Sequence, residues 1–181
     1  EWVDPLWLDA WGHRLWTVPP NSQGYLSLLA AGIADGLDLP SDPSDGLWAH
    51  LLVEAARHAA FDRVDSLYDG ADGMALLNPE VITQRRGNIN PDSAAVLGDT
   101  YAGGGTIYLT TTDSNGGGVS FIQSNAAGFG AHLVAPGTGI FLQNRGAGFN
   151  LMPGHPAEYQ AGKRAPHTLS PAMITTADGA L

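Results

Sequence analysis

Apolar residues in the first half of the chain repeat at the spacing of α-helices. One such stretch covers residues 23–36, where Gly36 ends the pattern. A longer stretch covers residues 45–68, with apolar residues repeated four positions apart. Pro79 suits the first turn of another short helix over 79–86, which Gly87 would end. The pattern therefore predicts three helices before residue 88.

Period-two alternation is typical of strands, and it occurs mainly in the second half of the chain. A first strand is predicted at Arg14–Val18, ahead of Pro19. The later strands are predicted over 106–113 and 119–124, joined by a turn at 114–117, then over 139–142 and at the end of 166–176. Helices followed by strands predict an α+β layered fold.

Residues 88–105 carry no periodic pattern and end in three glycines. We therefore expect an exposed, mobile segment between the helical and the strand-rich halves. Both ends of the chain look cut from something longer, because it opens on Glu1-Trp2-Val3 without Met and closes on a predicted turn.

Composition excludes several classes of function. A net charge of −10 argues against nucleic-acid binding, which requires a basic surface. The absence of cysteine excludes disulfides and thiolate chemistry. No apolar run reaches membrane-spanning length, no histidine shows metal-ligand spacing, and no cofactor motif is present.

The sequence does not settle the compartment, although the cytoplasm is slightly favoured over a periplasmic or secreted location. It also leaves open whether the protein forms a homo-oligomer.

The most informative motif is the glycine run 103–105 followed by Thr106. A phosphate-binding loop would need a helix after the glycines, whereas a strand is predicted here. A flexible linker is one interpretation. The other is self-cleavage, in which the Thr106 hydroxyl attacks the carbonyl of Gly105 and the freed α-amine, of pKa about 8, serves as a base. The local residues alone leave both open.

Several segments, found in the same order in one known family, cover nearly the whole chain. They are Val18-Pro19-Pro20-Asn21-Ser22-Gln23-Gly24, Thr106-Ile107-Tyr108-Leu109, residues 119–125, 128–130 and 136–146, Gly162-Lys163-Arg164 and residues 166–171. Together they resemble γ-glutamyltranspeptidases (glutathione hydrolases), on both sides of the processing junction of that family.

This resemblance implies a partial αββα sandwich of the N-terminal-nucleophile (Ntn) hydrolase type. Residues 1–105 would belong to the large subunit and its junction loop, and residues 106–181 would open the small, catalytic subunit. It further implies self-cleavage between Gly105 and Thr106, with Thr106 as the nucleophile toward γ-glutamyl or related acyl amides. Ser124 would hydrogen-bond the nucleophile, while His167 and Thr168 would lie where the family holds the substrate carboxylate.

The sequence also departs from the family pattern around the substrate. Tyr108 replaces a histidine, Ala126 replaces a polar ligand, and Gly148 stands where an acidic residue would bind the substrate ammonium group. Arg145 replaces the amide partner of that acid. A guanidinium suits a carboxylate rather than an ammonium group. We therefore expect weak recognition of a free α-ammonium group and a donor such as an acylated or dicarboxylate amide.

The remainder of the precursor is the expected partner, since the family's substrate-clamping arginine and oxyanion-hole glycines would lie outside residues 1–181. This chain alone would then be inactive or weakly active. Two alternatives remain: a catalytically silent Ntn-fold scaffold or binding domain, and a cephalosporin-acylase-like amidase with the same nucleophile.

Overall fold

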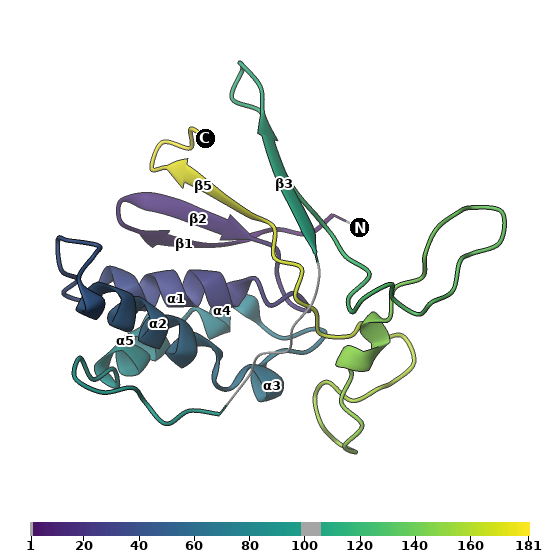
Figure 1. The fold of residues 1–181 in the computed structure, drawn as a ribbon, viewed down its shortest axis with the longest axis horizontal. Coiled ribbons are helices and arrows are strands. Elements are labelled where there is room, and N and C mark those ends of the chain that lie inside the picture. Colours follow the sequence, from purple (N-terminus) through teal and green to yellow (C-terminus); the bar gives the residue numbers. More distant parts are fainter. Residues whose placement is uncertain (1, 99–105) are drawn as a thin grey trace.

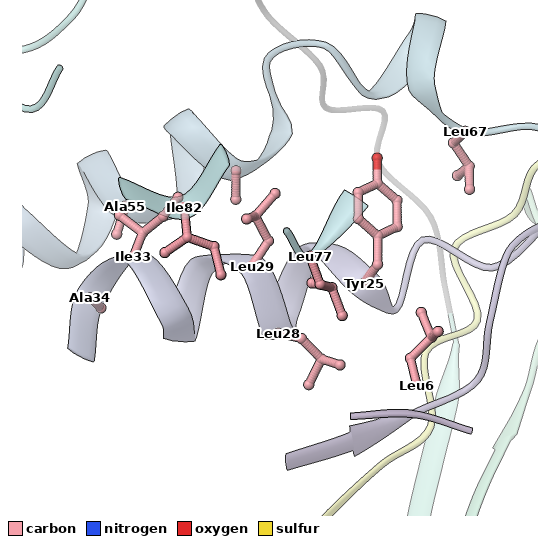
Figure 2. Close-up of a cluster of buried hydrophobic side chains, with 11 residues drawn as sticks. Leu6, Tyr25, Leu28, Leu29, Ile33, Ala34, Ala55, Leu67, Leu77 and Ile82 are labelled. Atoms are coloured by element: carbon pink, nitrogen blue, oxygen red, sulfur yellow. The ribbon is translucent and has the colours of Figure 1, made fainter. Parts of the chain in front are cut away.

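The computed structural model describes residues 2–98 and 106–181, and its core is organised around helix α1 (Tyr25–Asp35). This helix lies between a small sheet and the other helices (Figure 1). Figure 2 shows its apolar side chains directed into the core on both sides. The core residues are Leu6, Tyr25, Leu28, Leu29, Ile33, Ala34, Ala55, Ala59, Leu67, Leu77 and Ile82.

All the α-helices of the described residues lie before residue 88. They are α1, α2 (Gly46–Ala60), α3 (Arg63–Ser66), α4 (Gly73–Leu76) and α5 (Pro79–Gly87). The Asp45 side chain accepts a hydrogen bond from the Leu47 amide at the start of α2. The Asn78 side chain does the same for Glu80 ahead of α5, whose first turn holds Pro79. The predicted helices over 23–36 and 79–86 are therefore confirmed, with small shifts at their ends.

The long helix predicted over 45–68 is wrong in its second half, because α2 ends at Ala60. Arg85 of α5 donates hydrogen bonds to the carbonyl oxygens of His58 and Ala59, at 2.8 and 3.1 Å. It also pairs with Asp62 at 2.6 Å between Nη2 and Oδ2. The guanidinium thus satisfies carbonyls at the end of α2, and the chain turns into the separate helix α3.

The main sheet has three antiparallel strands in the order β1-β2-β5. Their bounds are β1 (Leu6–Ala10), β2 (His13–Thr17) and β5 (Ala172–Thr176). The strands predicted at 14–18 and at the end of 166–176 are confirmed, whereas β1 was not predicted. Leu15 of β2 pairs with Leu8 on one side and Ile174 on the other. The sheet therefore joins the parts of the chain that precede and follow Thr106.

Strands β3 (Ile107–Thr112) and β4 (Gly118–Gln123) form a separate two-stranded sheet. The predicted hairpin is confirmed, and Gly116 in its turn has a positive φ of 82°. All six residues of β3 are exposed, so β3 is not the central strand of a helix-covered sheet within the described residues. The mixed α+β class is confirmed, whereas the described residues do not confirm the αββα arrangement.

The strand predicted over 139–142 is wrong, because only an isolated bridge between Val134 and Phe141 forms there. Gly137 and Gly139 both have positive φ values, of 74° and 70°. These turn conformations fold the chain back after too few residues for a ladder. Most of the segment between β4 and β5 is irregular, apart from the 3₁₀ helix η1 (Arg145–Gly148).

Residues 88–98 are mostly exposed and lack regular structure, as predicted, but side chains of α2 hold them in place. His50 Nε2 lies 2.9 Å from the Asn90 carbonyl oxygen, and Ala95 is bonded through both backbone groups to Glu54 and Arg57. The rest of the predicted mobile segment, 99–105, lies outside the described residues.

Among the described residues, every helix is too short or too polar to span a membrane.

Candidate active site

The β3–β4 register predicts that Thr106 and Ser124 are neighbours. Ile107 pairs with Gln123, so one further step places Thr106 opposite Ser124. Directly opposed residues of an antiparallel pair point to the same face, with Cβ atoms about 4.5–5.5 Å apart. Ser124 Oγ also accepts a hydrogen bond from the Ala126 amide at 2.9 Å. Gly105, the other half of the predicted cleavage site, lies outside the described residues.

The same face of the hairpin carries Tyr108, Ser120 and Ile122, because side chains two positions apart point the same way. The Tyr108 hydroxyl lies 2.8 Å from Ser120 Oγ and donates to the Ala172 carbonyl oxygen at 3.1 Å. Tyr108 therefore fastens the hairpin to the start of β5.

A cavity of about 310 Å³ lies beside this face. Ile122 of β4 lines it, together with His167, Arg164 and Leu169 from the segment before β5. Residues 18–22, which connect β2 to α1, form another wall. Since Thr106 and Ser124 are expected on the face of Ile122, the cavity is the candidate substrate site. Thr168 is exposed and does not line it, so the predicted pair His167 and Thr168 is not brought together there.

His167 is fixed by its backbone and is neutral at physiological pH. Its amide donates to the Asn21 carbonyl oxygen and its own carbonyl accepts from the Gln23 amide, both at 2.9 Å. Burial, together with the nearby charges of Arg145, Arg164 and Arg63, lowers the pKa of His167 to about 4. Nδ1 accepts a hydrogen bond from the Leu169 amide at 3.2 Å, so Nε2 carries the proton. The imidazole offers a donor, and it carries no charge.

Arg145 begins η1, and its side chain is partly buried. Its Nη2 atom is buried and has no hydrogen-bond partner among the described residues. Burial lowers its pKa, although a guanidinium stays charged near neutral pH. The Asn144 amide donates to the Asn125 carbonyl oxygen at 3.1 Å, so Arg145 follows directly on a contact with the loop after Ser124. A guanidinium with one buried nitrogen that lacks a partner among the described residues is therefore held next to the hairpin.

Gly148, at the end of η1, has no room for a side chain. A Cβ atom at this position would lie 2.6 Å from the Pro166 carbonyl oxygen. An acidic residue could be accommodated only if the 165–167 backbone moved. Packing therefore leaves no space for an acidic side chain at the position where the resemblance predicts the ammonium-binding residue.

Two further arginines near His167 had no predicted role. Arg63 of α3 donates to Gln23 Oε1 at 2.7 Å, and Arg164 pairs with Asp69 at 2.8 Å between Nη2 and Oδ1. Both contribute to the lowered pKa of His167. In the sequence, only the adjacent Lys163 and Arg164 indicated a positive charge here, and nothing linked them to Arg63.

Within residues 2–98 and 106–181 no group of three or more His, Asp or Glu could hold a metal ion.

Comparison with known proteins gives the family of this chain. The sequence model described as Gamma-glutamyltranspeptidase matches residues 1–181. The chain belongs to the gamma-glutamyltranspeptidase family. Among curated members, the oxamate amidohydrolase proenzyme of Klebsiella pneumoniae is 37% identical over 97% of this chain, and a glutathione hydrolase-like proenzyme of Bacillus subtilis is 34% identical over 96%.

A solved structure has a similar fold. The cephalosporin acylase from Bacillus halodurans superposes on all of the chain with a TM-score of 0.88 and 37% identity. This supports the mixed helix and sheet fold as that of an Ntn-hydrolase relative. The chain spans 34% of the length of that protein, and 34% of the Klebsiella and Bacillus subtilis proenzymes.

Proposed function

We propose that this chain is the part of an amidohydrolase precursor that contains its self-cleavage site and nucleophile. Thr106 Oγ1 attacks the Gly105 carbonyl carbon, forms an ester by acyl shift, and becomes a free N-terminus when water hydrolyses that ester. Support comes from the relatives, which are named as proenzymes, and from the β3–β4 register, whose extension by one residue would set Thr106 opposite Ser124 on the face of Ile122, which lines the cavity. The domain boundary between 105 and 106 follows from the same proposal.

In the processed enzyme, Thr106 Oγ1 attacks the amide carbon of the substrate while the Thr106 α-amine takes the hydroxyl proton. The C–N bond breaks, the amine leaves with that proton, and an acyl-threonine ester remains. Water or an acceptor amine then releases the acyl group. Ser124 would hydrogen-bond Thr106, and His167 would donate from Nε2 to the substrate. Thr168 is proposed as a substrate-binding residue from the resemblance alone, because it is exposed and does not line the cavity.

The acyl donor is proposed to carry a carboxylate and to need no ammonium group. The observation that carries this is the buried Nη2 of Arg145, which has no hydrogen-bond partner among the described residues. An acid at Gly148, on the same 3₁₀ helix, would require the 165–167 backbone to move. A guanidinium attracts a carboxylate and repels an ammonium group. The Klebsiella relative is named for oxamate, an amide that carries a carboxylate.

A simple acylase is the second candidate, favoured by the likeness to cephalosporin acylase.

The exposed apolar residues of β3 and β4, such as Ile107 and Phe121, are proposed to contact the remainder of the precursor.

The test compares kcat/KM of the full-length enzyme for oxamate, a glutaryl amide, the matching γ-glutamyl amide and a neutral acyl amide. We expect the glutaryl and γ-glutamyl donors to differ by less than about tenfold, because no carboxylate receives the ammonium group. Arg145→Gln should lower kcat/KM for the carboxylate donors by about ten- to a hundredfold and spare the neutral amide. A wild-type preference of a thousandfold or more for γ-glutamyl would show that another residue binds the ammonium group.

A further inference from the structure

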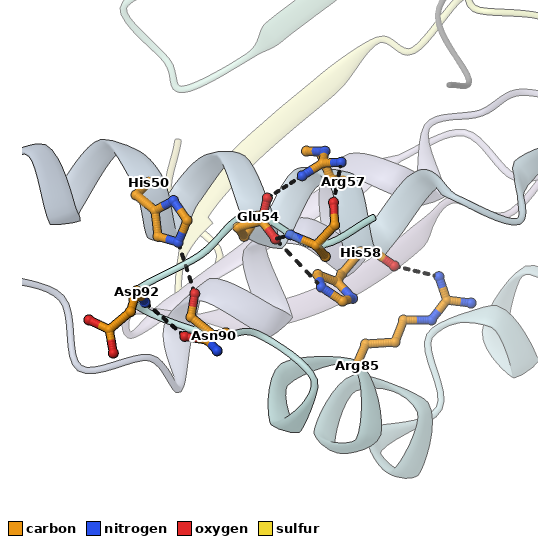
Figure 3. Close-up of polar contacts among 8 residues, drawn as sticks. His50, Glu54, Arg57, His58, Arg85, Asn90 and Asp92 are labelled. Atoms are coloured by element: carbon orange, nitrogen blue, oxygen red, sulfur yellow. Dashed lines mark hydrogen bonds and ion pairs between the residues drawn. The ribbon is translucent and has the colours of Figure 1, made fainter. Parts of the chain in front are cut away.

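One residue of the irregular segment 88–98 is held through both of its backbone groups by charged side chains. Glu54 Oε2 accepts a hydrogen bond from the Ala95 amide at 2.9 Å. Arg57 Nη2 donates one to the Ala95 carbonyl oxygen at 2.7 Å. Figure 3 shows Glu54 and Arg57 side by side on α2, directed toward this segment. We call these two side chains with Ala95 the clamp.

The clamp contains a buried charge. The Glu54 side chain is 1% exposed, and its Oε1 lies 2.5 Å from Arg57 Nη1. Burial raises the pKa of Glu54, but the Ala95 amide and Arg57 outweigh burial, so the pKa is below its ordinary value. A buried carboxylate is costly unless it is paired and hydrogen-bonded. Here its second partner is a loop backbone, which ties the loop to the helix.

A second contact holds the same segment nearer its start. His50 Nε2 lies 2.9 Å from the Asn90 carbonyl oxygen, and the Asn90 side chain accepts from the Asp92 amide at 2.8 Å (Figure 3). Ile89 packs against the core. The segment therefore has a defined path along α2 between Asn90 and Ala95. The clamp is the last of these contacts before Thr106, which follows Ala95 by eleven positions.

We propose that Glu54 and Arg57 position the chain for self-cleavage by fixing the backbone at Ala95. This rests on the proposed cleavage at Gly105–Thr106. Intramolecular attack depends on how often the hydroxyl and the carbonyl meet in the reactive geometry. Anchoring the chain at Ala95 on one side and in the β3–β4 hairpin on the other limits the backbone conformations from which that attack must start. The clamp touches neither the cavity nor the hairpin, so its residues act on processing and not on amide turnover.

The experiment follows cleavage of the full-length precursor during cell-free synthesis on denaturing gels. Glu54→Gln weakens the charged pair, and Ala95→Pro removes the Ala95 amide donor while leaving α2 intact. Both variants should cleave about tenfold more slowly than wild type. Once fully processed, they should have the wild-type kcat/KM. Asp62→Asn, between α2 and α3, is the control, because it removes the ion pair with Arg85 without touching Ala95, and it should cleave at the wild-type rate.

Three outcomes would overturn the inference. Wild-type cleavage rates in both Glu54→Gln and Ala95→Pro would show that the clamp has no part in processing. Equal slowing in Asp62→Asn would assign the effect to general stability. A lower kcat/KM in processed variants would place the clamp in catalysis. A wild-type precursor that never cleaves would instead contradict the proposed function itself.

Discussion

At the scale of single residues, His167 gives the fold a defined pH dependence. Its pKa is about 4 in the folded protein, because of burial and the nearby arginines, against about 6.5 when unfolded. The unfolded chain therefore binds the proton more readily between these values. The stabilisation from neutral His167 is complete above about pH 6.5 and is lost as the pH falls to about 4.

Replacing His167 with Gln should reduce that loss in the full-length protein. The measurement is the free energy of unfolding by denaturant at pH 7, 5.5 and 4.5, in wild type, His167→Gln and the exposed control His13→Gln. We expect the wild type and the control to lose stability in parallel and the His167 variant to lose less. Identical pH slopes for all three proteins would show that His167 is not held neutral by the fold.

Gly148 provides a second residue-scale test, with its control two positions away. Gly148→Ala should destabilise the full-length protein by about 1–3 kcal/mol, because the new Cβ would meet the Pro166 carbonyl oxygen. Gly146→Ala, in the same 3₁₀ helix, meets no atom within 4 Å and should have little effect. Equal stability of the two variants in denaturant unfolding would mean that position 148 has room for a side chain.

How much of the site the sequence could predict depends on distance along the chain. Thr106 and Ser124 flank the two ends of one hairpin, so alternation and a turn are sufficient to predict that they lie opposite each other. The approach of Arg63, Arg145 and Arg164 to His167 was not predictable, because it depends on how α3, η1 and the segment before β5 pack together. A pattern within one stretch of sequence cannot predict such a contact.

At the scale of elements, two adjacent arginines of α5 bind the ends of two other helices. Arg85 donates to the carbonyl oxygens of His58 and Ala59 in α2, and Arg86 donates to those of Gly32 and Ile33 in α1. Cations are favoured at helix C-termini, where carbonyls lack intrahelical partners. These two residues therefore couple α5 to both helices.

Each of Arg85→Met and Arg86→Met should lower the free energy of unfolding of the full-length protein by about 1.5–3 kcal/mol, because charged hydrogen bonds to the carbonyls are lost. Gln84→Ala, an exposed neighbour on α5, is the control and should change it by less than about 0.5 kcal/mol. Denaturant unfolding provides the comparison. Arginine variants as stable as the control would show that the carbonyls are satisfied in another way.

Whether a helix or strand could be predicted depends on whether the residues that define it lie close together in the sequence. Asp45 and the Asn78-Pro79 pair cap helices with their own side chains, so these starts were predictable. The break after Ala60 was not, because Arg85, which stabilises it, lies far along the chain. Strand β1 is five residues long and is defined by its pairing with β2, which a single segment does not reveal.

At the scale of the whole molecule, β5 returns from beyond Thr106 to pair with β2, so the parts before and after the proposed cleavage site form one sheet. Thr17 Oγ1 and Asn21 Nδ2 add hydrogen bonds to the carbonyl oxygens of Pro171 and Ala165, at 3.0 and 2.6 Å. Cleavage before Thr106 would therefore leave two pieces joined by strand pairing and side-chain contacts.

The central claim is that Thr106 cleaves the chain before itself, and the intact mass of the purified full-length protein tests it most directly. Wild type should give two fragments that meet at the Gly105–Thr106 bond, and Thr106→Ser should give the same fragments more slowly, because a hydroxyl remains. Thr106→Ala should give one folded, uncleaved chain. An uncleaved wild type, or a Thr106→Ala protein cut at the same bond, would contradict the account.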